Sequence, residues 1–276
     1  MPTDSRIVET AAPPRPTANW AVRHKAGLAQ FAVIVVLVAF WQVGASAGFL
    51  DHQVFGSPES VWQQLSAWYE SGLLLSGALS TLGTSLLGFA IGSVAAVIVA
   101  FLLSLTRIGR TLLAPLVFLG YSAPRLAFLP MLIIWLGIGI QATVVLAVLV
   151  AFMDAFFPAY EGAIGVDSEL LSVTAMMGGS RFQVLRTVRF PASLAWVALG
   201  FSVAIPQSFG AVVFAQLFAG TSGLGYLLKT SADDFNGAGL IGGTLVVAAM
   251  AILINWIVGA IVGRYLKWQT NETATR

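Results

Sequence analysis

The 276-residue chain is too apolar to be a soluble domain. Hydrophobic residues make up 58% of it and charged residues only 9%, whereas soluble domains carry about a quarter charged residues. The net charge of +2 and the absence of cysteine exclude the strongly basic footprint of a nucleic-acid-binding protein and any thiolate metal site. The composition therefore predicts an all-α polytopic membrane protein.

Residues 1–25, rich in proline and polar groups, are predicted to form a disordered cytoplasmic tail, and residues 265–276 a second cytoplasmic tail. The first apolar run, 26–48, follows Arg23-His24-Lys25 and ends near Ala45-Ser46-Ala47. These features also fit a cleaved signal peptide. We favour a retained transmembrane helix, because the run is long enough to span a bilayer.

Residues 57–72 predict a separate, non-spanning helix that Ser57 caps, Pro58 opens and Gly72 ends. Its larger apolar side chains fall on one face: Val61, Trp62, Leu65, Trp68 and Tyr69. This pattern is typical of an amphipathic helix in the outer membrane interface. Such a helix either anchors the protein or contacts an external binding protein, and we favour anchoring.

Six stretches have the roughly 20 apolar residues that a spanning helix needs. They lie near residues 26–48, 75–105, 111–137, 141–162, 191–217 and 239–263. The third and fourth form one block that must cross twice, with its hairpin at Gly137-Ile138-Gly139-Ile140-Gln141. Pro115, Pro124 and Pro130 predict that the third helix is broken or kinked.

Lysine and arginine predict the orientation of these helices, because positively charged loops stay in the cytoplasm. With the N-terminus inside, the cytoplasmic segments hold Arg6, Arg15, Arg23, Lys25, Arg107, Arg110, Arg181, Arg186, Arg189, Arg264, Lys267 and Arg276. Lys229 alone falls outside, and Arg125 lies within the third helix. Both termini and the loop 163–190 are therefore expected in the cytoplasm, and the family resemblance described below implies a bacterial inner membrane.

The loop 163–190 is much longer than a simple crossing between membrane helices requires. It carries three arginines and the pair Gly178 and Gly179, and Pro191 opens the helix that follows. Gly178 and Pro191 stand thirteen residues apart, with apolar Val188 and Phe190 just before the proline. This pattern predicts a docking segment that a partner outside the membrane binds.

The same spacing resembles the EAA loop of bacterial ABC importer permeases, although Ser172, Val173 and Thr174 stand where that family has Glu-Ala-Ala. Further motifs are similar to the nitrate, sulfonate and taurine branch, which includes vitamin-precursor carriers. They are Ser57-Pro58-Glu59-Ser60-Val61, Gly88-Phe89-Ala90-Ile91-Gly92, Pro124 to Pro130, Trp135 to Gly139, Phe156-Phe157-Pro158 and Ser222 to Leu227. Two departures are Thr84, often arginine in relatives, and Gln216, usually glutamate.

The resemblance implies a type I ABC importer permease with its transmembrane core at 75–264. It implies a second permease copy (a homodimer), two ATP-binding subunits and a substrate-binding protein as partners. The cytoplasmic coupling loop 163–190 would contact the ATPase through Ala175, Gly178, Gly179, Ser180, Val188 and Pro191. The solute would be a small anion of the nitrate, sulfonate or taurine kind, or a vitamin precursor.

The sequence lacks the Gly-x-x-x-x-Gly-Lys-Ser/Thr loop that cradles ATP phosphates, so ATP is expected on a partner chain, and this chain is expected not to be an enzyme. A secondary transporter is an alternative, but we find no internal repeat. An intramembrane serine protease is another, from Gly220-Thr221-Ser222-Gly223, and Gly44-Ala45-Ser46-Ala47-Gly48 matches a hydrolase nucleophile string. Both strings lack a histidine placed to take the serine proton.

Three charges are predicted at membrane depth: Arg125, Asp154 and Glu161. A central charge costs about 2.5–3.5 kcal/mol on insertion scales, so each should face protein or water. Arg125 and Asp154, with Gln207 and Gln216, are candidate residues of the translocation path. The alternatives are a structural Arg125–Asp154 pair, or Arg125 and Glu161 reaching to the cytoplasmic interface, and the sequence leaves these open.

Two GxxxG pairs, Gly88/Gly92 and Gly259/Gly263, predict close helix packing. The sequence does not decide whether each pair packs within the chain or across a dimer.

Overall fold

The computed structural model describes residues 20–49, 51–106, 109, 111, 115, 119–120, 124–166, 173–174, 176–178 and 180–265. All regular structure in these ranges is helical, which confirms the all-α prediction. Most of both predicted tails, the predicted loop residues Ala175 and Gly179, and Arg107 and Arg110 lie outside the described residues.

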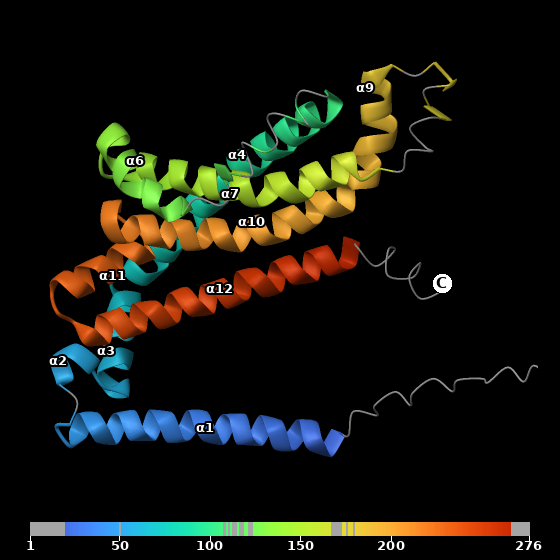
Figure 1. The fold of residues 1–276 in the computed structure, drawn as a ribbon. Helices are drawn as coiled ribbons and strands as arrows, with labels where there is room; N and C mark the ends of the chain where they lie inside the picture. The colour runs from blue at the N-terminus through green and yellow to red at the C-terminus, as the bar shows by residue number, and fades with distance from the viewer. Residues whose placement is uncertain are drawn as a thin grey trace, which may run out of the picture.

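The centre of the molecule is a bundle of α4 (Leu73–Leu105), α7 (Ile140–Ile164) and α10 (Phe190–Ala219), with α12 (Gly237–Tyr265) beside α10 (Figure 1). Four helical segments of the described chain are long and apolar enough to cross a membrane. They contain the whole of the predicted runs 75–105, 141–162, 191–217 and 239–263. The six-helix count stays a prediction.

Small residues bring α4 and α7 into close contact. A Cβ on Gly88 would lie 2.4 Å from Ala147 Cβ, and one on Gly92 would lie 2.4 Å from the Val148 carbonyl oxygen. This GxxxG pair therefore packs within the chain. A Cβ on Gly259 of α12 would meet nothing within 4 Å, and the same holds for Gly263.

The predicted third helix is broken where its prolines stand. After Pro124 the chain forms a 3₁₀ turn, η2 (Arg125–Phe128), and then the short helix α6 (Leu129–Leu136), with Pro130 in its first turn. Gly137 and Gly139 follow with φ of +81° and +138°, and α7 begins at Ile140. The predicted hairpin is thus confirmed, and the break places Arg125 on an irregular turn beside α7 and α10.

The predicted non-spanning helix is α3 (Pro58–Glu70), and its caps are as expected. Ser57 Oγ accepts a hydrogen bond from the Ser60 amide (3.1 Å), Ser60 Oγ accepts one from the Ser57 amide (2.8 Å), and Gly72 follows with a φ of +74°. The predicted apolar face is divided. Val61, Leu65 and Trp68 lie toward α12, near its Gly242 and Gly243, whereas Trp62 and Tyr69 are 73% and 71% exposed.

The short helices mark the two ends of the bundle. The helices α2 (His52–Phe55), α3, α6 and α11 (Leu224–Asp233) lie at one end, and α9 (Arg181–Val184) lies at the other (Figure 1). The helix α1 (Trp20–Ser46) begins, and α12 ends, at the same end as α9 (Figure 1). Because α1 begins at Trp20, it includes residues that the sequence assigned to the disordered tail.

Candidate functional site

A cavity of about 550 Å³ opens between η2, α7 and α10. Its lining residues are Pro124, Arg125, Leu126, Val150, Gln207, Gly210, Ala211 and Phe214. Two of the four predicted path residues, Arg125 and Gln207, thus come together although they are far apart in the sequence. The cavity lies along apolar membrane helices, where a polar wall is costly unless it faces water or protein.

Arg125 forms an ion pair with Asp154 of α7, and its Nη1 donates to Asp154 Oδ1 at 2.5 Å. The Asp154 side chain is 2% exposed and that of Arg125 is 21% exposed. The predicted ion pair between Arg125 and Asp154 is therefore present, and it connects the wall of the cavity to the buried core of the bundle. Glu161, the third charge, is exposed near the end of α7.

Gln207 and Gly210 give the α10 side of the cavity its shape. Gln207 is exposed and directly follows Pro206, which lies inside α10 and lacks an amide N–H. Gly210 has nothing within 4 Å of an added Cβ. The sequence alone did not single out Gly210, because a glycine that leaves space open looks the same as one that allows close packing.

Gln216, the fourth predicted path residue, does not line this cavity. It is buried, and its Oε1 accepts hydrogen bonds from Thr81 Oγ1 (2.9 Å) and from the Gly225 amide (3.2 Å). Thr81 Oγ1 also accepts a hydrogen bond from the Leu224 amide at 2.8 Å. Gln216 and Thr81 therefore tie the start of α11 to α10 and α4. Thr84, the other departure from the family pattern, is also buried on α4.

The two serine strings hold structural hydrogen bonds. Ser222 Oγ lies 3.2 Å from Ser80 Oγ, and Ser46 Oγ donates to the Val43 carbonyl oxygen at 3.1 Å. Ser46 is at the end of α1 and Ser222 in the turn before α11. Their roles are those expected of turn and helix-end residues.

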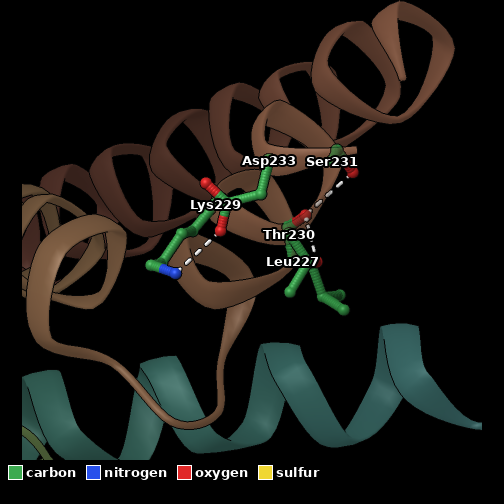
Figure 2. A network of polar contacts seen from close by, with 5 residues as sticks. All are labelled: Leu227, Lys229, Thr230, Ser231 and Asp233. Atoms are coloured by element: carbon green, nitrogen blue, oxygen red, sulfur yellow. Dashed lines mark hydrogen bonds and ion pairs between the residues drawn. The ribbon is translucent and has the colours of Figure 1, made fainter. Parts of the chain in front are cut away.

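The helix α11 carries a small network of polar contacts beyond this turn (Figure 2). Lys229 Nζ pairs with Asp233 Oδ2 at 2.8 Å, and both side chains are well exposed. Thr230 Oγ1 and Ser231 Oγ donate to the Leu227 carbonyl oxygen at 3.0 and 2.8 Å. These contacts are local to the helix, so they stabilise its last turns and do not form a site.

The described part of the predicted docking segment has an ordered entry into α10. Gly178 has a φ of +80°, a left-handed backbone conformation that glycine adopts without a Cβ clash. The Ser180 amide donates to Gln183 Oε1 (2.8 Å), and the Gln183 amide donates to Ser180 Oγ (3.3 Å), which forms a capping box for α9. A π-helix, η3 (Leu185–Arg189), then leads into α10, with Pro191 in its first turn.

The docking segment also presents apolar side chains. Met176 and Met177 are 80% and 82% exposed, and Phe182 is exposed as well, whereas Val188 is half-buried. Large exposed apolar groups close to an exposed charge such as Arg186 are typical of a surface that contacts another protein. Because α9 stands apart from the bundle at one end (Figure 1), this surface is accessible.

The helical bundle, the cavity with Arg125 and Gln207 on its wall and the projecting segment are those of a polytopic membrane protein with an internal site. A family model described as binding-protein-dependent transport system inner membrane component matches residues 88–267. The chain belongs to this family. It is a multi-pass permease subunit of the inner membrane and is not itself an enzyme.

Similar proteins agree with this assignment. A probable ABC transporter permease of Haemophilus influenzae is 30% identical over 196 residues, which cover 71% of this chain and 79% of the relative. The taurine transport permease TauC of Escherichia coli is 26% identical, with 91% and 92% covered, and the riboflavin transport permease RibX of Chloroflexus aurantiacus is 28% identical, with 86% and 89% covered. The family match sets aside the secondary-transporter and protease alternatives.

The fold is also found in solved structures. A chain from the inward-facing MetNI methionine ABC transporter superposes with a TM-score of 0.61 and 20% identity, and the match covers 71% of this chain and 97% of that one. A chain of an amino acid ABC transporter has a TM-score of 0.56, with 16% identity. At these identities the likeness concerns the fold alone.

Proposed function

We propose that two copies of this chain form the membrane path of an ATP-driven importer. In this proposal an external binding protein delivers a small solute, and two ATP-binding subunits on the cytoplasmic side supply the energy. The observation that carries the proposal is the cavity with Arg125 and Gln207 on its wall. In this proposal the cavity opens onto the water-filled path between the two copies, so that the exposed part of the Arg125 side chain faces water.

The solute is proposed to be a small oxyanion such as a sulfonate, with a vitamin precursor as the alternative. A guanidinium offers planar N–H donors that match an oxyanion, and Asp154 holds Arg125 in one orientation. The name of TauC refers to taurine, and that of a Bacillus subtilis relative to aliphatic sulfonates. The name of RibX refers to riboflavin, which supports the alternative.

The segment from Met176 to Pro191 is proposed to dock on the ATPase. Its exposed Met176, Met177 and Phe182 provide apolar area, and the left-handed φ of Gly178 turns the chain between Met177 and Phe182. Closing of the ATPase pair would move this segment and switch the path between outward-facing and inward-facing states.

A substitution at Gly178 tests the docking. Gly178→Trp should abolish uptake by the reconstituted transporter and reduce co-purification of the ATPase, while membrane insertion stays normal. Gly48→Trp is the matched control, because Gly48 also has a left-handed φ (+75°) with open space around it. Gly48 follows the last residue of α1, at the end of the molecule opposite to α9 (Figure 1). Normal uptake by the Gly178→Trp protein would refute the docking assignment.

A further inference from the structure

The end of α4 is tied to the residue that precedes α10. Arg189 Nη1 donates to the Ser104 carbonyl oxygen at 2.9 Å and lies 3.4 Å from Ser104 Oγ. Ser104 is fully buried in the last turn of α4, and Arg189 is the last residue of the π-helix. The contact joins positions 85 residues apart and connects the docking segment to a helix of the central bundle.

This contact has a clear electrostatic reason. The last carbonyl groups of a helix have no partner within the helix, and they form the negative end of its dipole. The last turn of α4 contains no basic residue of its own. Arg189 supplies the missing cation through a charge-assisted hydrogen bond, which is stronger than one between neutral groups.

Apolar contacts hold the same junction on both sides of Arg189. The Phe190 ring packs on Phe101 of α4 with ring centroids 5.4 Å apart. At the start of the π-helix, Leu185 packs against the core cluster that contains Phe101 and Tyr160. Both ends of the π-helix are thus anchored to the bundle, and α9 projects beyond them (Figure 1).

The π-helix is suited to transmit movement. Its wider turn is rare, occurs often at functional sites, and holds an extra residue relative to an α-helix. A displacement of α9 would therefore bend or rewind residues 185–189 before it reached α10. Arg189 lies at the end of this element, where such a change would pull directly on α4.

We propose that Arg189 is a positioning residue that passes movement of the docking segment to α4. The proposal rests on the proposed docking of that segment on the ATPase. The helix α4 packs along α7 through Gly88 and Gly92, and α7 carries Asp154, the partner of Arg125. Movement of the end of α4 therefore has a contiguous packed route to the wall of the cavity.

The complete transporter in liposomes provides the first test, through the amount of taurine, the solute in the name of TauC, taken up per ATP hydrolysed. Arg189→Gln should lower this ratio about tenfold, equivalent to about 1.4 kcal/mol, while the ATPase still co-purifies. Arg264→Gln is the matched control, because it removes the same charge from an exposed position at the same end of the molecule. An unchanged ratio in Arg189→Gln, or an equal loss in Arg264→Gln, overturns the proposal.

This outcome is separate from that of the docking test. If Gly178→Trp transports normally, the docking is wrong, whereas if Gly178→Trp fails and Arg189→Gln is normal, only the role of Arg189 is wrong. If Arg189→Gln gives little folded protein, Arg189→Lys replaces it, with a loss of about threefold expected because an ammonium lacks the planar fork of donors. No loss in the lysine variant would then overturn the proposal.

A second test needs the permease alone. The chain contains no cysteine, so single cysteines at exposed Phe182 on α9 and exposed Leu102 on α4 can carry spin labels without other changes. The distribution of distances between the labels should be narrow in the parent chain and clearly broader with Arg189→Gln, but not with Arg264→Gln. An unchanged distribution in Arg189→Gln would mean that Arg189 does not hold the two elements together.

Discussion

Neutralising one member of the Arg125–Asp154 pair should destabilise the protein strongly. Breaking a buried ion pair by removing one partner costs about 3–5 kcal/mol, because the other charge is left buried without compensation. Arg125→Gln leaves the almost fully buried Asp154 carboxylate, so we expect a loss of about 4 kcal/mol. Asp154→Asn leaves Arg125, which is 21% exposed and partly solvated, so we expect about 3 kcal/mol.

The double variant distinguishes a pair from two independent residues. With both charges removed no uncompensated charge remains, so the loss in Arg125→Gln/Asp154→Asn should be smaller than in either single variant. For a chain of this size, 1 kcal/mol shifts the melting temperature by roughly 2–4 °C, so the single variants should melt roughly 6–16 °C lower. The assay is thermal unfolding of the purified permease in detergent, monitored by circular dichroism.

The exposed Lys229–Asp233 pair is the control for this cycle. Lys229→Gln and Asp233→Asn should show no measurable coupling, because exposed pairs gain little and are screened by salt. Losses at Arg125 and Asp154 that simply add in the double variant would refute the reasoning. Uptake by the folded double variant then separates a structural role from a transport role. Normal uptake by this variant would exclude a role for Arg125 in the translocation path.

Most of the helices follow from the sequence because their cause is local. Long apolar runs, the capping serine of α3 and the prolines near Arg125 determine where helices form and break. The Arg125–Asp154 pair was one of several alternatives, because no local pattern reports that residues 29 positions apart meet. The structure shows the pair because the 3₁₀ turn lies beside α7, and the role of Arg125 in the path stays a proposal.

The two GxxxG pairs have the same spacing but different surroundings, and the sequence does not report those surroundings. Gly88 and Gly92 lie against α7, whereas Gly259 and Gly263 meet open space, although both pairs have the same spacing. The aromatic face of α3 is divided because α12 covers only part of it. Gln216 lies away from the cavity because its hydrogen bonds are to Thr81 of α4 and Gly225 of α11, and no local pattern in the sequence reports these partners.

Three further predictions follow from the same contacts. Reporter fusions after residue 265 should be active only in the cytoplasm, because α12 ends at the same end of the molecule as α9 (Figure 1), and a periplasm-active fusion there would contradict the six-helix topology. Gly92→Ala should lower the free energy of unfolding by about 3 kcal/mol, since its Cβ would collide with the α7 backbone, whereas Gly259→Ala should change it by less than about 0.5 kcal/mol. Gln216→Ala should cost about 1–3 kcal/mol, because the buried Gly225 amide loses its acceptor. Hydrogen exchange should localise this loss to the start of α11, while Arg125 and the cavity stay protected as in the parent chain. Faster exchange spread equally over α7 and η2 would instead place Gln216 in one network with the cavity, and the separation of the two sites would be wrong.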